Sequence, residues 1–126
     1  MLQLERVHKS YRQGSERIDA LKGVDLRVDA PSFCGVMGPS GSGKTTLLHL
    51  VAGLDQPDDG RVVVDETDLA ALSESRLSAF RRHSVGMIFQ QYNLISTLSG
   101  RQNIGLPGVL DRRSRQWIER RVDELI

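Results

Sequence analysis

The residues with the clearest chemical capacity form one glycine-rich stretch, Gly38-Pro39-Ser40-Gly41-Ser42-Gly43-Lys44-Thr45. This stretch matches the pattern G-x-x-x-x-G-K-[ST] at every fixed position. Glycines let successive backbone N–H groups point into one concavity, and the N-terminus of a following helix adds positive potential, so such a loop can hold a polyphosphate. We expect Lys44 to reach the β- and γ-phosphates, Thr45 to bind Mg²⁺ and Thr46 to add a hydroxyl near the α-phosphate. The alternative is a glycine-rich turn with a solvated lysine.

The segments around this loop predict a strand before it and a helix after it. Phe33–Met37 is a short apolar run bounded by glycine, which is typical of a buried strand that enters a tight loop. Apolar residues at helical spacing over 45–54 predict a largely buried helix. Further upstream, apolar residues over 2–7 and 18–28 alternate with polar ones and predict two strands joined near Gly14.

The downstream segments continue the α/β pattern. DQPDDG over 55–60 is dense in turn formers, and Val62–Val64 predicts a short strand. A helix is expected to begin near Ser73, and the apolar run Val85–Phe89 predicts another strand. Beyond Ser99 the helical signal is weaker.

Glycine and proline shape the expectation for the last part of the chain. Gly100, Gly105, Pro107 and Gly108 are expected to break any long helix there. Apolar residues over 117–126 then predict an amphipathic helix.

Composition sets limits on the class of protein. The chain has 126 residues and a formal net charge of +1, so length favours one domain, and the charge gives no field that would gather nucleic acid. Its apolar stretches are far shorter than the roughly 20 residues that cross a bilayer, so no transmembrane segment is expected. Cys34 is the single cysteine, which favours a reducing compartment, and its predicted strand makes it a small core residue. The three histidines lie too far apart in sequence to predict a metal site.

Four stretches together indicate a protein family much more specifically than the glycine loop alone. They are Tyr11 upstream of ALKGVDLRV, then GPSGSGKTTLLHLVAGLDQPDDGRV, then DLAALSESRLSAFRRHSVGMIFQQYNLISTLS, and NIGLP. Over nearly the whole chain they resemble the ATP-binding domain of ABC transporters, in particular the group that serves lipoprotein release and macrolide or peptide export. The resemblance implies an α/β P-loop NTPase core with an N-terminal antiparallel β subdomain, and ATP and Mg²⁺ as cofactors.

The resemblance also implies roles for individual residues. Tyr11 stands where the family places an aromatic ring that stacks on adenine, and the alternative is a tyrosine packed at a strand end. Gln90 stands at the family's glutamine loop, where the amide binds Mg²⁺ or orients water, and the alternative is a solvated glutamine. Lys44 and Gln90 are thereby expected to act in catalysis.

The same resemblance implies partners. In the family the region that holds Tyr92–Ile95 and Leu98 docks an integral membrane permease, and the equally weighted alternative is that these residues pack against the terminal helix. A homodimer or a second ATPase domain is expected to complete the site. The expected location is cytoplasmic, peripheral on the inner face of the cell membrane.

Residues 1–126 are expected to be the N-terminal part of such a domain, truncated before the signature and Walker B regions, with the phosphate loop at 38–45 and the glutamine loop near 90. Leu98–Gln102 imitates the signature LSGGQ but stands where the family has a helix start, and Asp65-Glu66 imitates the catalytic carboxylate pair but stands at an expected hairpin turn. We interpret both as coincidences.

Three functions are alternatives for a chain with this glycine loop. The first is the ATP-binding subunit of an ABC transporter, which couples ATP binding and hydrolysis to transport through a permease. The second is a catalytically inactive nucleotide-binding remnant of a shortened gene. The third, a phosphate-loop kinase or GTPase, would need an acceptor-binding lid or an N-K-x-D base-reading motif, and the sequence contains neither.

Overall fold

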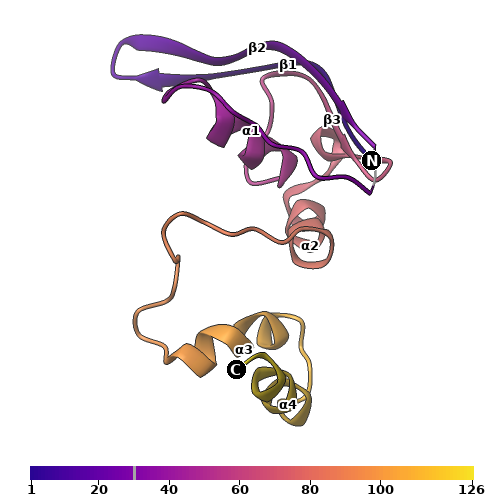
Figure 1. The fold of residues 1–126 in the computed structure, drawn as a ribbon, viewed down its shortest axis with the longest axis vertical. Helices are drawn as coiled ribbons and strands as arrows, with labels where there is room; N and C mark the ends of the chain where they lie inside the picture. Colours follow the sequence, from indigo (N-terminus) through magenta and orange to yellow (C-terminus); the bar gives the residue numbers. More distant parts are fainter. Residues whose placement is uncertain (30) are drawn as a thin grey trace. The chain divides into compact units, whose positions relative to one another are not determined.

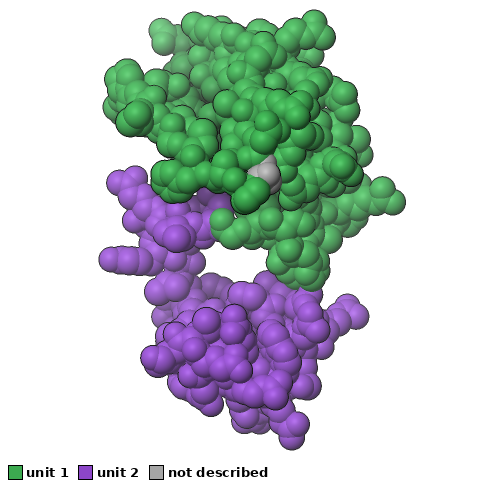
Figure 2. Space-filling view, turned by 45° about the vertical axis from the view of Figure 1, so that its right-hand side comes forward, with its two compact units in different colours: residues 1–86 green, residues 87–126 purple. Residues whose placement is uncertain are grey.

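The computed structural model describes residues 1–29 and 31–126. They form two compact units, residues 1–86 and 87–126 (Figure 2).

The first unit contains an antiparallel sheet. Its strands are β1 (Leu2–Gln13), β2 (Glu16–Val28), β3 (Asp59–Val64) and β4 (Thr67–Asp68), in the order β2-β1-β3-β4 (Figure 1). All three strand pairings are antiparallel. The predicted hairpin around Gly14 and the predicted antiparallel subdomain are thereby confirmed.

A bulge in β1 places two apolar residues on the core face. Leu4 and Val7 are three positions apart, which in a regular strand would put them on opposite faces. The register of β1 shifts between them, and Arg6 has a φ of 45°. As a result Leu4 is 2% exposed and Val7 is fully buried. Gly60, with a φ of 88°, faces the bulge, where a Cβ would lie 2.4 Å from the Arg6 carbonyl oxygen.

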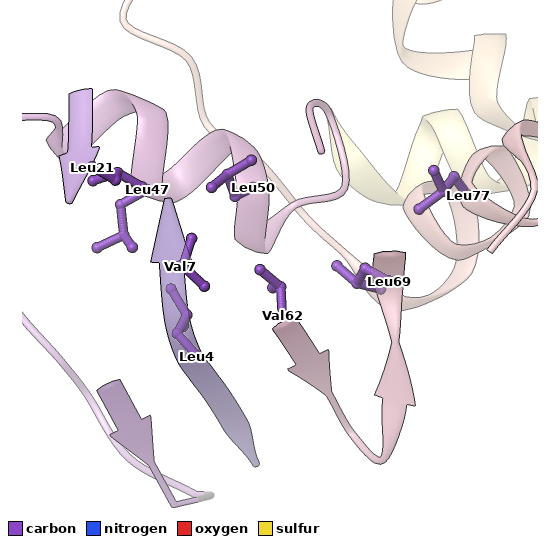
Figure 3. Close-up of a cluster of buried hydrophobic side chains, with 8 residues drawn as sticks. All are labelled: Leu4, Val7, Leu21, Leu47, Leu50, Val62, Leu69 and Leu77. Atoms are coloured by element: carbon purple, nitrogen blue, oxygen red, sulfur yellow. The ribbon is translucent and has the colours of Figure 1, made fainter. Parts of the chain in front are cut away.

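Helices complete the core of the first unit. They are α1 (Lys44–Val51), the 3₁₀ turn η1 (Leu69–Ala71) and α2 (Glu74–Ser84). The cluster is shown in Figure 3 and consists of Leu4, Val7, Leu21, Leu47, Leu50, Val62, Leu69 and Leu77. It holds the helix that follows the glycine loop against the sheet. The predicted helix is confirmed, but it ends at Val51 and buries only Leu47 and Leu50, so the expectation that it is largely buried is wrong.

The structure contradicts two predicted strands. Phe33–Met37 and Val85–Phe89 have no strand structure, and Phe33 and Ile88 are fully exposed. A buried parallel strand needs neighbours that pair with its N–H and C=O groups, and no described segment pairs with either run. Cys34 is therefore exposed, and its prediction as a core residue is wrong.

The second unit contains α3 (Gly100–Leu110) and α4 (Arg115–Leu125). The predicted terminal helix is confirmed, but the expectation that glycine and proline would break the preceding helix is wrong. A Cβ at Gly105 would lie 3.0 Å from Ile118, and one at Gly108 would lie 2.9 Å from it. These glycines allow α4 to pack closely on α3, and this packing outweighs their low helix propensity. No helix in the described chain is both long enough and apolar enough to cross a membrane.

The signature-like stretch is a helix start. Ser99 caps α3 by accepting from the Gln102 N–H, and the Gln102 side chain accepts from the Ser99 N–H. This reciprocal pair is a capping box. The interpretation of Leu98–Gln102 as a coincidence is supported by this local role.

Asp65 and Glu66 form the tight turn between β3 and β4. Their φ values are 45° and 67°, the left-handed values that a two-residue hairpin turn requires. The interpretation of this pair as a turn is confirmed.

We expect Glu66→Gly to raise the free energy of unfolding by about 1 kcal/mol, because glycine adopts a left-handed backbone without the Cβ clash. Urea unfolding followed by circular dichroism measures the change. Glu66→Ala is the control, since it removes the same carboxylate but keeps the Cβ. Equal gains in both variants would contradict the backbone explanation.

Candidate nucleotide site

Two glycines of the glycine loop, Gly38 and Gly43, have little space for a side chain. Gly41 and Gly43 have φ values of 77° and 86°. A Cβ on Gly43 would lie 2.5 Å from the carbonyl oxygen of Ala20 in β2, and one on Gly38 would lie 2.8 Å from Ser42 Oγ. The glycines at these positions therefore let the loop turn tightly against the sheet before α1 begins.

Lys44 is the first residue of α1, and its ammonium lies within the loop. Its Nζ donates to the carbonyl oxygens of Gly38 at 2.9 Å and Pro39 at 2.6 Å, and to Ser42 Oγ at 3.3 Å. Among the described residues, no side chain caps the N-terminus of α1. The loop thus combines a lysine ammonium with the free N–H groups of a helix start, which is an arrangement that attracts anions.

Two hydroxyls follow Lys44 on the same helix turn. Thr45 is exposed and Thr46 is half-buried. Nowhere in residues 1–29 and 31–126 do three or more His, Cys, Asp or Glu side chains gather in a way that could hold a metal ion. The exposed Thr45 hydroxyl could bind Mg²⁺ together with phosphate oxygens, which is how Mg²⁺ commonly binds.

Tyr11 lies on the part of the sheet that borders the loop. It pairs with Ile18 of β2, two residues before Ala20, whose carbonyl oxygen packs against Gly43. The Tyr11 side chain is 40% exposed. Gly43, which precedes α1, therefore packs against β2 two residues from the residue that pairs with Tyr11. The stacking role of Tyr11 stays a prediction.

A network that the sequence did not predict surrounds Tyr11. The Tyr11 hydroxyl donates to Asp55 Oδ2 at 2.9 Å, and Lys9 Nζ donates to Asp55 Oδ1 at 2.7 Å. The Lys9 ammonium also lies 5.4 Å from the centre of the Tyr11 ring. In the same turn, Asp58 Oδ2 accepts from the Ser10 N–H and hydroxyl, both at 2.7 Å. DQPDDG indicated only a turn, and no local signal links it to β1.

The network favours the ionised form of its carboxylates. Partial burial raises the pKa of Asp55, but hydrogen bonds from Lys9, the Gln56 N–H and Tyr11 outweigh burial, so the pKa lies below its ordinary value. Hydrogen bonds from the Ser10 hydroxyl and N–H lower the pKa of Asp58.

We expect the first unit to lose stability on acidification, below the ordinary aspartate range. A carboxylate whose pKa is lower in the folded chain stabilises it above the unfolded pKa, and this contribution is lost as pH falls through the folded pKa. Urea midpoints measured between about pH 7 and about pH 2 test this. Asp58→Asn should flatten part of the acid slope, and Glu16→Gln at the exposed hairpin tip should not. A slope unchanged in Asp58→Asn would contradict the assignment.

Gln90 lies in the second unit, in an exposed stretch without helix or strand. Its role as a ligand of Mg²⁺ or of water stays a prediction. Nearby, Tyr92 is 89% exposed and Leu94 is 64% exposed. These two side chains do not pack against the terminal helix, so internal packing, one of the two alternatives for this segment, is wrong for them.

Asn103 of α3 holds the end of that exposed segment. Its Oδ1 accepts from the Ile95 N–H at 2.8 Å. Its Nδ2 donates to the carbonyl oxygens of Ile95, Leu98 and Ser99, each at 3.1 Å. One side chain thus satisfies several backbone groups of the turn that precedes α3.

The sequence of the chain is similar to those of several known proteins. The sequence model of the family described as "ABC transporter" matches residues 21–126. The chain is 45% identical over 126 residues to a methionine import ATP-binding protein, MetN 1, of Yersinia pestis bv. Antiqua (strain Antiqua), covering 100% of this chain and 36% of that protein. It is 40% identical over 128 residues to the lipoprotein-releasing system ATP-binding protein LolD 1 of Rhodopseudomonas palustris, covering 100% of this chain and 57% of that protein.

Solved structures show the same fold. The chain has a TM-score of 0.90 and 38% identity to the dimeric, post-hydrolysis ATP-binding cassette MJ0796 bound to ADP and Pi, covering 98% of this chain and 55% of that one. A second dimeric structure of MJ0796, described as a bacterial ABC transporter cassette, gives a TM-score of 0.88 and 39% identity, with 98% and 53% covered. The chain therefore spans about a third to a little over half of the length of these relatives.

Proposed function

The chain belongs to the ABC transporter family, and on this premise we propose that it binds ATP with Mg²⁺ as part of a transporter's ATP-binding subunit. In the whole protein, ATP hydrolysis drives transport through an integral membrane permease. The observation that carries the proposal is the position of Lys44, whose ammonium lies within the glycine loop at the uncapped N-terminus of α1.

The loop binds the phosphates in this proposal. Its backbone N–H groups and the start of α1 face the α- and β-phosphates, and Lys44 reaches the β- and γ-phosphates. Mg²⁺ offsets phosphate charge and takes the Thr45 hydroxyl as a ligand, while Thr46 lies near the α-phosphate. The close contacts of Gly38 with Ser42 Oγ and of Gly43 with the Ala20 carbonyl oxygen support this assignment, because they leave no room for a side chain at these two positions.

Tyr11 stacks on the adenine base. The 40% exposed aromatic ring of Tyr11 offers a flat apolar face, and a base presents a matching one. This assignment is supported by the pairing of Tyr11 with Ile18, because Ala20, two residues further along β2, packs against Gly43.

Partners complete the function. A second ATPase domain, in a homodimer or a related pair, is supported by the two dimeric cassettes that share this fold. The exposed side chains of Tyr92 and Leu94 offer a surface for the permease, and Gln90 precedes them as the residue that senses the γ-phosphate side. The location proposed for the subunit is the inner face of the cell membrane, where the permease lies.

The proposal is tested by calorimetric titration of the chain with ATP, tripolyphosphate and AMP in the presence of Mg²⁺. ATP should bind, tripolyphosphate should compete with it, and AMP should bind far more weakly because it lacks the β- and γ-phosphates. EDTA should weaken ATP binding. If AMP bound as well as ATP, the phosphate loop would not be the main contact. Coupling is tested by ATP hydrolysis of the whole protein with and without its permease.

A further inference from the structure

We propose that Asp55 is a positioning residue for the base of the bound nucleotide, acting through the Tyr11 hydroxyl. The inference rests on the proposed function, in which the Tyr11 ring stacks on adenine. It adds a residue outside the glycine loop that decides how firmly that ring is held.

The Tyr11 ring is held at its tip and over one face. The Tyr11 hydroxyl donates a hydrogen bond to Asp55 Oδ2 at 2.9 Å, and the Lys9 ammonium lies 5.4 Å from the ring centre. Lys9 is itself fixed, because it donates to Asp55 at 2.7 Å and to the Gln56 carbonyl oxygen at 2.6 Å. Tyr11 is 40% exposed, so part of the ring stays accessible to a base.

Asp55 connects this ring to the helix that begins at the phosphate loop. The backbone N–H groups of Leu54 and Asp55 both donate to the carbonyl oxygen of His49 in α1, at 2.9 Å and 3.4 Å. The N-terminus of the same helix begins at Lys44. The Asp55 carboxylate thus ties the position of the ring to the element that holds the phosphates, so base and phosphate contacts are set by one helix.

This arrangement reduces the ordering cost of binding. A free tyrosine side chain loses rotamer freedom when a base stacks on it, whereas a ring held by Asp55 has already lost it. Removing the hydroxyl contact should therefore weaken ATP binding about two- to tenfold. It should leave tripolyphosphate binding unchanged, because tripolyphosphate has no base.

The experiment measures the affinity of the 126-residue chain for Mg-ATP and for Mg-tripolyphosphate in four variants. Tyr11→Phe keeps the ring and removes only the hydroxyl, and Asp55→Ala removes the acceptor. The double variant tests whether Asp55 acts through that hydroxyl. Asp59→Asn is the matched control, because its carboxylate is in the same turn and accepts only from the Gly60 N–H among the described contacts.

The expected result is a loss of ATP affinity in both single variants, at least as large in Asp55→Ala because that change also releases Lys9. The double variant should lose no more than Asp55→Ala alone, and tripolyphosphate affinity should be unchanged throughout. Parallel losses for ATP and tripolyphosphate would overturn the positioning role in favour of a structural one. Unchanged ATP affinity in Tyr11→Phe would overturn the inference and leave the proposed function intact. If the wild-type chain bound neither ligand, the proposed function would fail, and the inference with it.

Discussion

Lys44→Ala is expected to lower the affinity of the chain for Mg-ATP by about 100-fold or more. The Lys44 ammonium is the cationic side chain inside the glycine loop, where it donates to two carbonyl oxygens and a hydroxyl. Charge-assisted hydrogen bonds to phosphate are roughly twice as strong as neutral ones, so losing them removes a large part of the binding free energy. Calorimetric titration with ATP measures the loss.

Lys22→Ala is the matched control for this prediction. It removes the same charge from an exposed position on β2. In Lys44→Ala the affinities for tripolyphosphate and for ATP should both fall. In Lys22→Ala neither affinity should fall. An equal decrease in both variants would show that the effect comes from net charge and not from the loop.

Leu50→Ala is expected to lower the free energy of unfolding by about 3 kcal/mol. Leu50 is 1% exposed and lies in the cluster that joins α1 to the sheet. Its truncation removes buried apolar surface and leaves a cavity beneath the helix that carries the phosphate loop. Urea unfolding followed by circular dichroism measures the change.

Leu48→Ala serves as the control on the same helix, because Leu48 is 52% exposed. Its effect should stay within about 0.5 kcal/mol. Comparable destabilisation in the two variants would contradict the view that α1 is stabilised mainly by its buried face.

Local patterns predicted the elements whose partners are close in sequence. The hairpin around Gly14 follows from alternating residues and a turn, and α1 and α4 follow from helical spacing of apolar residues. The runs Phe33–Met37 and Val85–Phe89 were different, because an apolar run indicates a preference for burial but does not supply a partner strand. Whether such a run becomes a strand depends on segments elsewhere, and none of those described pairs with it.

Helix α3 shows the same limit in reverse. Its glycines have low helix propensity, and this cost was the basis of the prediction from sequence. The packing contact with α4 that offsets the cost is not visible in the sequence of the segment. Gly105 and Gly108 let Ile118 approach closely. The gain depends on a residue in another helix, so it could not be deduced from the segment itself.

The candidate site also has one part that the sequence predicts and one part that it does not. The glycine loop was recognised because all its functional groups lie within eight consecutive residues, 38–45. The contact of Asp55 with Lys9 joins residues 46 positions apart, and the two lie together only because α1 returns the chain to β1. The spacing of these residues in the sequence does not predict such a contact.

The hydrogen bonds of Lys44 to the loop carbonyls have a consequence for selectivity. A ligand that accepts hydrogen bonds from this ammonium displaces the carbonyl oxygens of Gly38 and Pro39, which already accept them. A neutral oxygen offers no advantage over the carbonyls already there, and a weakly charged oxyanion offers a small one. A polyphosphate provides several charged oxygens at once, and charged acceptors bind an ammonium more strongly than neutral ones. In the proposed function, the loop carbonyls therefore compete with weakly charged anions for Lys44, and a polyphosphate displaces these carbonyls more readily than such anions do.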